Sequence, residues 1–130
     1  MTAELWLLAA AVVLGLVQVL APAAAGILSR QRDMRWAASA RDEARPLSGA
    51  PARLDRALKN YQENFPLFAA ALLIAHLADK TGDLTLWGAH LWVWSRVLYV
   101  PAYAFGSPLR PLFWALSLTG LGLILLALVA

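Results

Sequence analysis

Residues 59–78, KNYQENFPLFAAALLIAHLA, join a polar start to an apolar run long enough to cross a lipid bilayer. A transmembrane helix needs about 20 predominantly apolar residues to span the hydrocarbon core. Near its start, however, this segment carries an amide, Asn60, and a carboxylate, Glu63. A charged group at membrane depth costs at least roughly 2 kcal/mol, so its presence indicates either a functional site or a structural partner elsewhere in the chain.

The composition is that of a small integral membrane protein. The chain has 130 residues, 61% of them hydrophobic and 15% charged, with a mean hydropathy of +0.62. Soluble domains are far more polar. The chain has no cysteine, which excludes disulfides and cysteine nucleophiles, so any thiol must come from a bound ligand. His76 and His90 have no nearby carboxylates at metal-site spacing, so no metal site is expected.

Four apolar stretches predict four transmembrane helices in a single domain, residues 1–130. They are Leu5–Leu28, about Ala57–Ala78, about Leu84–Phe105 and about Leu112–Val129. Helices are expected because the bilayer interior offers the backbone no water to bond, and short connections favour an all-α four-helix bundle. The first stretch ends in APAAAG, which resembles a signal-peptide cleavage site. Its length and its acidic start favour a retained anchor instead.

Charge predicts the orientation in the membrane. Eight of the eleven Lys and Arg residues fall between Arg30 and Lys59. The positive-inside rule therefore places the loop at about 30–55 in the cytoplasm and both termini on the opposite side. This clustering indicates topology, and no nucleic-acid partner is expected. Arg32 and Arg35 favour contact with membrane lipid headgroups. Short loops and alanine richness favour a bacterial inner membrane.

Arg53, Arg56, Asn60 and Glu63 are spaced by three, four and three residues, so they form one stripe on the second predicted helix. Guanidinium groups match carboxylates, while the deeper amide and carboxylate can accept an ammonium group. This pattern suits a zwitterionic ligand. A polar network between helices explains the same residues equally well.

A second stripe lies on the third predicted helix, where Arg96, Tyr99 and Tyr103 are spaced by three and four residues. Arg96 needs an anionic partner in its apolar surroundings, and Glu63 is the carboxylate at comparable depth. We therefore predict an Arg96–Glu63 ion pair or a shared network. The two tyrosines can orient a ligand or anchor the helix at the membrane interface.

Arg110 stands in the short loop before the fourth predicted helix. A membrane-border arginine commonly serves only as a positive-inside anchor. If a thiol ligand bound nearby, its guanidinium would favour the thiolate form.

The segments RLDRALKNYQENFPLF (residues 53–68) and SRVLYVPAYAFGSPLR (residues 95–110) together resemble the MAPEG family, the membrane-associated proteins in eicosanoid and glutathione metabolism. The first matches a pattern of the type R-x-x-R-A-x-x-N-x-x-E-x-x-P-x-F. The second matches R-x-x-Y-x-x-x-Y followed by an arginine after a short loop. The resemblance covers essentially the whole chain.

This resemblance implies a four-helix subunit that forms a homotrimer and binds glutathione between subunits, near the cytoplasmic side. It implies that Arg110 is catalytic, as the arginine that stabilises the glutathione thiolate. It also implies that Arg30, or Arg32 in its place, joins the site of a neighbouring subunit. The other implied glutathione contacts are Arg53, Arg56, Asn60, Glu63, Tyr99 and Tyr103.

The predicted function is that of a membrane-bound glutathione transferase or peroxidase acting on hydrophobic electrophiles or lipid hydroperoxides. Two residues depart from the leukotriene synthases of the family, because Asn64 replaces a tyrosine and Leu58 a glutamine. They motivate the alternative of a non-catalytic lipid- or partner-binding protein, as five-lipoxygenase-activating protein is. A third reading, a proton-coupled exporter with Glu63 as relay, is disfavoured by the nearby arginines, which keep a carboxylate ionised.

Overall fold

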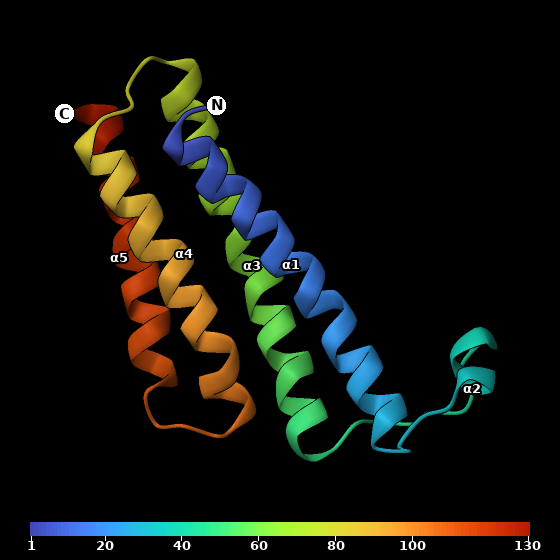
Figure 1. Cartoon of the computed structure of the whole chain (residues 1–130). Coiled ribbons are helices and arrows are strands. Elements are labelled where there is room, and N and C mark those ends of the chain that lie inside the picture. The colour runs from blue at the N-terminus through green and yellow to red at the C-terminus, as the bar shows by residue number, and fades with distance from the viewer.

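The computed structural model describes all residues, 1–130, and the chain is helical with no strands. Four long helices lie side by side (Figure 1). The helices are α1 (Ala3–Leu28), the short α2 (Met34–Ala38), α3 (Gly49–Leu77), α4 (Asp83–Ala104) and α5 (Arg110–Val129). The expected all-α class is thus confirmed.

The two ends of the molecule differ in what they carry. Both termini and the α3–α4 loop lie at one end, which we call the terminal end (Figure 1). The loop of residues 29–48 and the α4–α5 turn of residues 105–109 lie at the other, which we call the basic end. Within the loop, α2 projects beside the end of α1 and away from the other long helices.

Two helices are long and apolar enough to cross a membrane by length and composition. They are α1 and α5, each with a mean hydropathy of 2.3 over its most apolar part. The apolar parts of α3 and α4 are interrupted by the polar stripes. That α3 and α4 also cross the membrane therefore stays a prediction.

Helix α3 begins earlier in the chain than the apolar pattern predicts. α3 begins at Gly49, whereas the apolar pattern placed its start near residue 57. Pro51 falls in the first turn, where its missing N–H costs no hydrogen bond, so the polar residues after it continue the helix. The polar stripe of α3 consequently lies on a helix that extends beyond its apolar part.

An aromatic cluster holds three of the long helices together. The Trp92 ring of α4 stacks on the Phe68 ring of α3 with 4.0 Å between centroids and 1° between planes. The Tyr61 ring lies 5.5 Å from that of Trp92, and its hydroxyl donates to the backbone carbonyl of Ala11 in α1. All four residues are almost completely buried. This cluster fixes the height at which α3 and α4 face one another.

The contact between α4 and α5 depends on two glycines. A Cβ atom at Gly88 would lie 2.6 Å from the carbonyl oxygen of Gly120, and one at Gly120 would lie 2.5 Å from that of Gly88. Only hydrogen side chains allow this backbone-to-backbone approach, which is common between membrane helices. The two helices are thereby held close together along their lengths, and the turn of residues 105–109 joins the end of α4 to the start of α5.

Candidate functional site

An open cavity of ≈ 200 Å³ lies among α3, α4 and the start of α5. It is lined by Arg56, Lys59, Asn60, Glu63, Tyr99, Tyr103 and Arg110. Helical spacing explains the arrangement, since the lining residues of each helix recur every three or four positions. Arg110 joins them because it is the first residue of α5, directly after the turn at the basic end.

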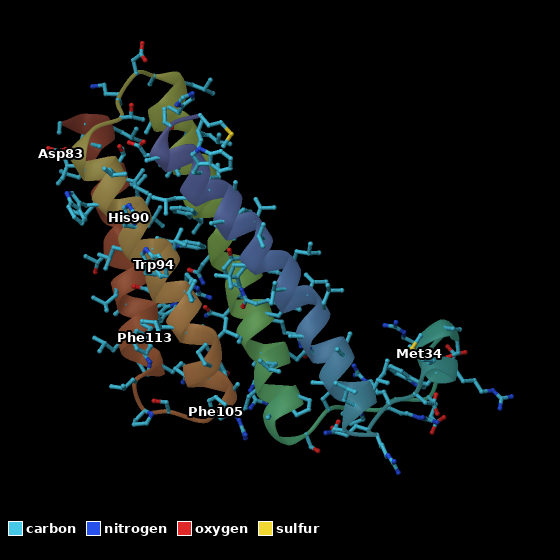
Figure 2. All side chains as sticks on the ribbon, in the orientation of Figure 1. Met34, Asp83, His90, Trp94, Phe105 and Phe113 are labelled. Carbon is cyan, nitrogen blue, oxygen red and sulfur yellow. The ribbon has the colours of Figure 1, made fainter.

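Figure 2 labels side chains at several heights along the molecule. Phe105 stands in the α4–α5 turn at the basic end, five residues before Arg110. His90 and Trp94 lie earlier in α4, closer to the terminal end of the molecule. There the Trp94 indole N–H donates to His90 Nδ1 at 3.3 Å. His90, and likewise His76 in the last turn of α3, do not line the cavity.

The ring of Tyr103 links two cationic side chains from different helices. The central carbon of the Arg110 guanidinium lies 4.6 Å from the ring centroid, and that of Arg56 lies 5.8 Å from it. The Tyr99 ring meets the Tyr103 ring edge-on, with 5.6 Å between centroids and 79° between planes. Cation–π attraction of this kind is worth roughly 0.5–2 kcal/mol for each pair, so the Tyr103 ring supports both arginines.

The cavity carries a surplus of positive charge. Three of its lining residues are cations, Arg56, Lys59 and Arg110, whereas Glu63 is its single carboxylate. Lys59 pairs with Asp55 outside the cavity at 3.3 Å. Neither arginine forms an ion pair within the chain, and Glu63 is exposed. The cavity therefore attracts an anionic ligand while offering one acceptor for an ammonium group.

The amide of Asn60 is oriented by its neighbour one turn later. Asn64 Nδ2 donates to the backbone carbonyl of Asn60 at 2.7 Å and to its Oδ1 at 3.3 Å. Because this oxygen already accepts a hydrogen bond, the Asn60 amide nitrogen is left to donate. A ligand carbonyl or carboxylate is the matching partner.

Six of the eight residues predicted for the glutathione site line this one cavity, and two do not. Arg53 instead donates from Nε to the backbone carbonyl of Ala104 at 2.7 Å, which holds the end of α4 against α3. Arg30 is exposed beyond the end of α1 with φ of 62°. Lys59 is a lining residue that the sequence reasoning missed. Its position three residues after Arg56 and four before Glu63 places it on the same face, which was the available signal.

The predicted Arg96–Glu63 ion pair is not formed within the chain. Arg96 is completely buried, and Nε and both Nη atoms have no hydrogen-bond partner. Its guanidinium carbon lies 4.2 Å from the centroid of the Tyr99 ring, 5.5 Å from that of Tyr61 and 6.0 Å from that of Trp92. The prediction was wrong because the Arg96 side chain points toward the rings of Tyr99, Tyr61 and Trp92, whereas the Glu63 side chain is exposed on the outside of the chain.

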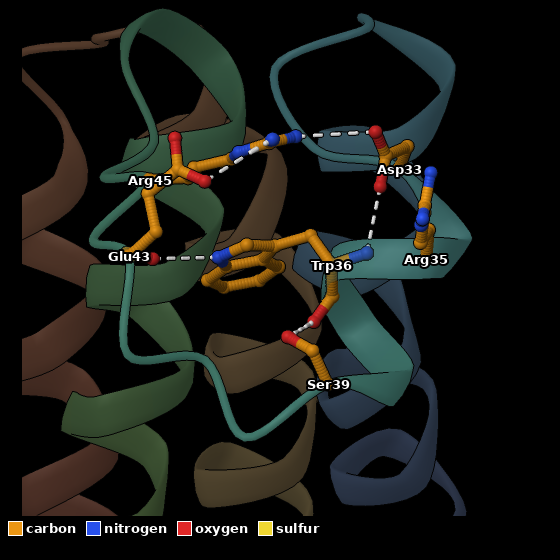
Figure 3. A pocket seen from close by; sticks show the side chains of 6 residues that line it. All are labelled: Asp33, Arg35, Trp36, Ser39, Glu43 and Arg45. Carbon is orange, nitrogen blue, oxygen red and sulfur yellow. Dashed lines mark hydrogen bonds and ion pairs between the residues drawn. The ribbon is translucent and has the colours of Figure 1, made fainter.

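The largest cavity, ≈ 380 Å³, lies in the loop at the basic end (Figure 3). Most of its polar groups, apart from the Arg35 guanidinium, already have partners. Arg45 bonds Asp33 at 3.2 Å and Glu43 at 3.5 Å, and the Trp36 indole N–H donates to the Glu43 carbonyl at 2.6 Å. The hydrogen bond from the Trp36 backbone N–H, followed by that from Arg45, holds the pKa of Asp33 below its ordinary value. These bonds shape the loop and leave little for a ligand.

Comparison with known proteins gives one clear result. The sequence profile of the MAPEG family matches residues 7–130, nearly the whole chain. No curated protein and no solved structure matches the chain significantly. The match includes every residue of the cavity. The chain is therefore a membrane protein that belongs to the MAPEG family, which includes glutathione transferases and peroxidases.

Proposed function

We propose that this protein is a membrane-bound glutathione transferase or peroxidase that acts on hydrophobic electrophiles or lipid hydroperoxides. The observation that carries the proposal is the cavity in which two unpaired arginines, two tyrosines and one exposed carboxylate meet. Glutathione has two carboxylates, one ammonium group and one thiol. The charges of the cavity complement those of this ligand.

Most of the cavity residues are suited to bind the polar groups of glutathione, and one, Arg110, is the residue we expect to act on its sulfur. Arg56 and Lys59 suit the carboxylates, and Glu63 suits the ammonium group. The Asn60 amide nitrogen suits a peptide carbonyl. Arg53 supports the site indirectly, because its bond to Ala104 holds the end of α4 in place. Its predicted direct contact with glutathione stays a prediction.

Arg110 is the proposed catalytic residue. A fixed guanidinium beside a thiol favours the thiolate, which is the nucleophile, and thus lowers the cost of ionisation at neutral pH. In conjugation, the sulfur forms a bond to an electrophilic carbon, and the bond that breaks there is the one to a leaving group such as halide or, in an addition, an epoxide C–O bond or a C=C π bond. The thiol proton passes to solvent, or to the opened acceptor through solvent. In the peroxidase reaction, two thiols reduce a hydroperoxide to an alcohol and water and become a disulfide. The protein itself needs no cysteine for either reaction.

The proposal includes four membrane-spanning helices and assembly as a homotrimer. Within one chain, Arg56 and Glu63 face outward and the cavity is open on one side. A neighbouring subunit would cover this side, and Arg30 at the end of its α1 is the residue we expect it to contribute. The loop with α2 would then face the cytoplasm, following the distribution of basic residues.

A second candidate function is binding of a lipid or a partner without catalysis. The bond from Asn64 to Asn60 favours it, because Asn64 uses its amide within the helix. A tyrosine at this position, as in the leukotriene synthases, would be available to a ligand. Under this alternative, wild-type protein binds its lipid ligand but conjugates no electrophile, and Arg110→Ala leaves lipid binding intact.

A glutathione titration and a conjugation assay test the proposal on the purified full-length protein. Calorimetry with wild type should show binding, and a chromogenic electrophile should be conjugated. Arg110→Ala should keep binding but lose thiolate absorbance and activity, whereas Glu63→Gln should weaken binding. Arg35→Ala, exposed in the loop outside this cavity, is the matched control. Absence of both glutathione binding and thiolate absorbance in wild type would refute the proposal.

A further inference from the structure

A small groove lies between the end of α1 and α2, away from the glutathione cavity. Its volume is ≈ 70 Å³. It is lined by Ala23, Ile27, Arg32, Trp36, Ala37 and Arg41. One side of the groove is thus the surface of a helix apolar enough to cross a membrane, and the other is a basic loop. Apolar and cationic groups meet here at the boundary of a predicted span.

The two arginines of the groove are held in place and lack counterions. Their guanidinium carbons lie 4.6 Å (Arg32) and 5.2 Å (Arg41) from the centroid of the Trp36 ring. Each also donates to a backbone carbonyl, Arg32 to Arg45 and Arg41 to Ala37. Neither forms an ion pair, and Arg45 binds both Asp33 and Glu43. Arginine has five N–H donors, so each keeps donors for an anion.

The apolar wall of the groove continues along α1. Leu16, Leu20, Ala23 and Ile27 are spaced by four, three and four residues, so they form one stripe that runs from the middle of the helix to the groove. Leu16 and Leu20 are each 59% exposed. A hydrocarbon chain lying along this stripe would bury apolar surface and reach the two arginines at its polar end.

We propose that this groove binds an anionic phospholipid, with its phosphate at Arg32 and Arg41 and an acyl chain along the α1 stripe. Charge decides the class of lipid. The headgroup of phosphatidylglycerol is a net anion, whereas the choline of phosphatidylcholine cancels the phosphate charge. Free phosphate lacks the chain that the apolar stripe would bind. The proposal does not depend on glutathione chemistry.

The test measures lipid retention by the purified full-length protein in a non-ionic detergent. Native mass spectrometry counts the phosphatidylglycerol and phosphatidylcholine molecules that remain bound. We expect wild type to prefer phosphatidylglycerol and Arg41→Gln to reduce its affinity about fivefold, since each basic residue near an anionic lipid surface contributes about 1 kcal/mol. Arg35→Gln removes the same charge from the same loop. Although its position in the sequence favours contact with headgroups, Arg35 lies outside the groove, so this variant should retain wild-type affinity for the bound lipid.

A second pair of variants tests the acyl-chain track without changing charge. Ala23→Phe fills the groove and should reduce phosphatidylglycerol retention, whereas Ala24→Phe, exposed on the neighbouring position of α1, should not. Equal retention of the two lipids, equal effects of Arg41→Gln and Arg35→Gln, or equal effects of the two phenylalanine variants would overturn the proposal. So would full competition by glycerol phosphate, or a change of oligomeric mass in place of lipid loss. Glutathione conjugation by Arg41→Gln should match wild type, which separates this proposal from the previous one.

Discussion

The guanidinium of Arg110 in α5 lies over the ring of Tyr103 in α4, with 4.6 Å between its central carbon and the ring centroid. This contact couples the proposed catalytic cation to a neighbouring helix. The same ring lies 5.8 Å from the guanidinium carbon of Arg56 in α3. Tyr103 can therefore act through its ring face, by holding the arginines, or through its hydroxyl, by contacting the ligand.

Two substitutions at Tyr103 separate these roles. Tyr103→Phe keeps the ring and should change kcat/KM for glutathione conjugation by less than about threefold. Tyr103→Leu removes the ring and should lower kcat/KM by about tenfold, because a cation–π contact is worth roughly 0.5–2 kcal/mol. Steady-state kinetics on both variants provide the check. If Tyr103→Phe loses as much as Tyr103→Leu, the hydroxyl is the active group and the ring-support account fails.

Gly88→Ala should destabilise the contact between α4 and α5. Its Cβ atom would lie 2.6 Å from the carbonyl oxygen of Gly120, so the helices would have to separate. We expect a loss of about 1–3 kcal/mol in the free energy of unfolding, as for other overpacked sites. Thermal unfolding in detergent measures it. Gly122→Ala is the matched control, because nothing lies within 4 Å of its added Cβ atom, and its stability should stay within about 1 kcal/mol of wild type.

Arg96→Met should leave the single chain as stable as wild type or raise its free energy of unfolding by about 1 kcal/mol. The change removes a buried charge whose nitrogens have no hydrogen-bond partner, and the cost of burying such a group offsets the cation–π contacts with Tyr99, Tyr61 and Trp92 that are lost with it. Arg53→Met is the comparison, because it removes the 2.7 Å bond to the Ala104 carbonyl and should destabilise by about 1–2 kcal/mol. Chemical denaturation gives both values. Marked destabilisation by Arg96→Met would instead reveal a counterion supplied by assembly or ligand.

The loop around α2 should lose order in acid. Asp33 caps α2 by accepting the Trp36 backbone N–H at 2.7 Å, and its pKa lies below the ordinary value of 3.8. A lowered folded-state pKa means that the stabilisation is complete above the unfolded-state pKa and is lost as pH falls through the folded-state value. The transition should therefore occur below pH 3.8. The fluorescence difference between wild type and Trp36→Phe reports it.

Asp33→Asn supplies the control for this pH dependence. Asparagine is also a good N-cap residue, so α2 should persist at neutral pH, but its amide does not titrate. The acid transition of Trp36 should consequently disappear in this variant. An unchanged transition would assign the effect to other carboxylates of the loop.

The sequence by itself determined the helical class, the family and the membership of the two polar stripes. Helical spacing places residues such as Arg56, Asn60 and Glu63 on one face before any tertiary contact forms, since it depends only on local backbone geometry. The motif residues of α3 and α4 were therefore predictable, and Lys59 could have been added by the same rule.

Only the tertiary structure decided which stripe residues share a cavity and which become structural. Spacing fixes a direction around one helix axis, whereas contact depends on how neighbouring helices rotate and how closely they approach. The Gly88–Gly120 approach packs α5 closely against α4, and the short turn of residues 105–109 keeps Arg110 near the end of α4. The same packing turns Arg96 into the cluster of Tyr61, Trp92 and Tyr99 and leaves Glu63 facing outward. Arg96 and Glu63 lie at similar depth on adjacent helices yet remain unpaired. The position of a residue in the sequence determines its depth, whereas helix packing determines how each helix is rotated about its axis.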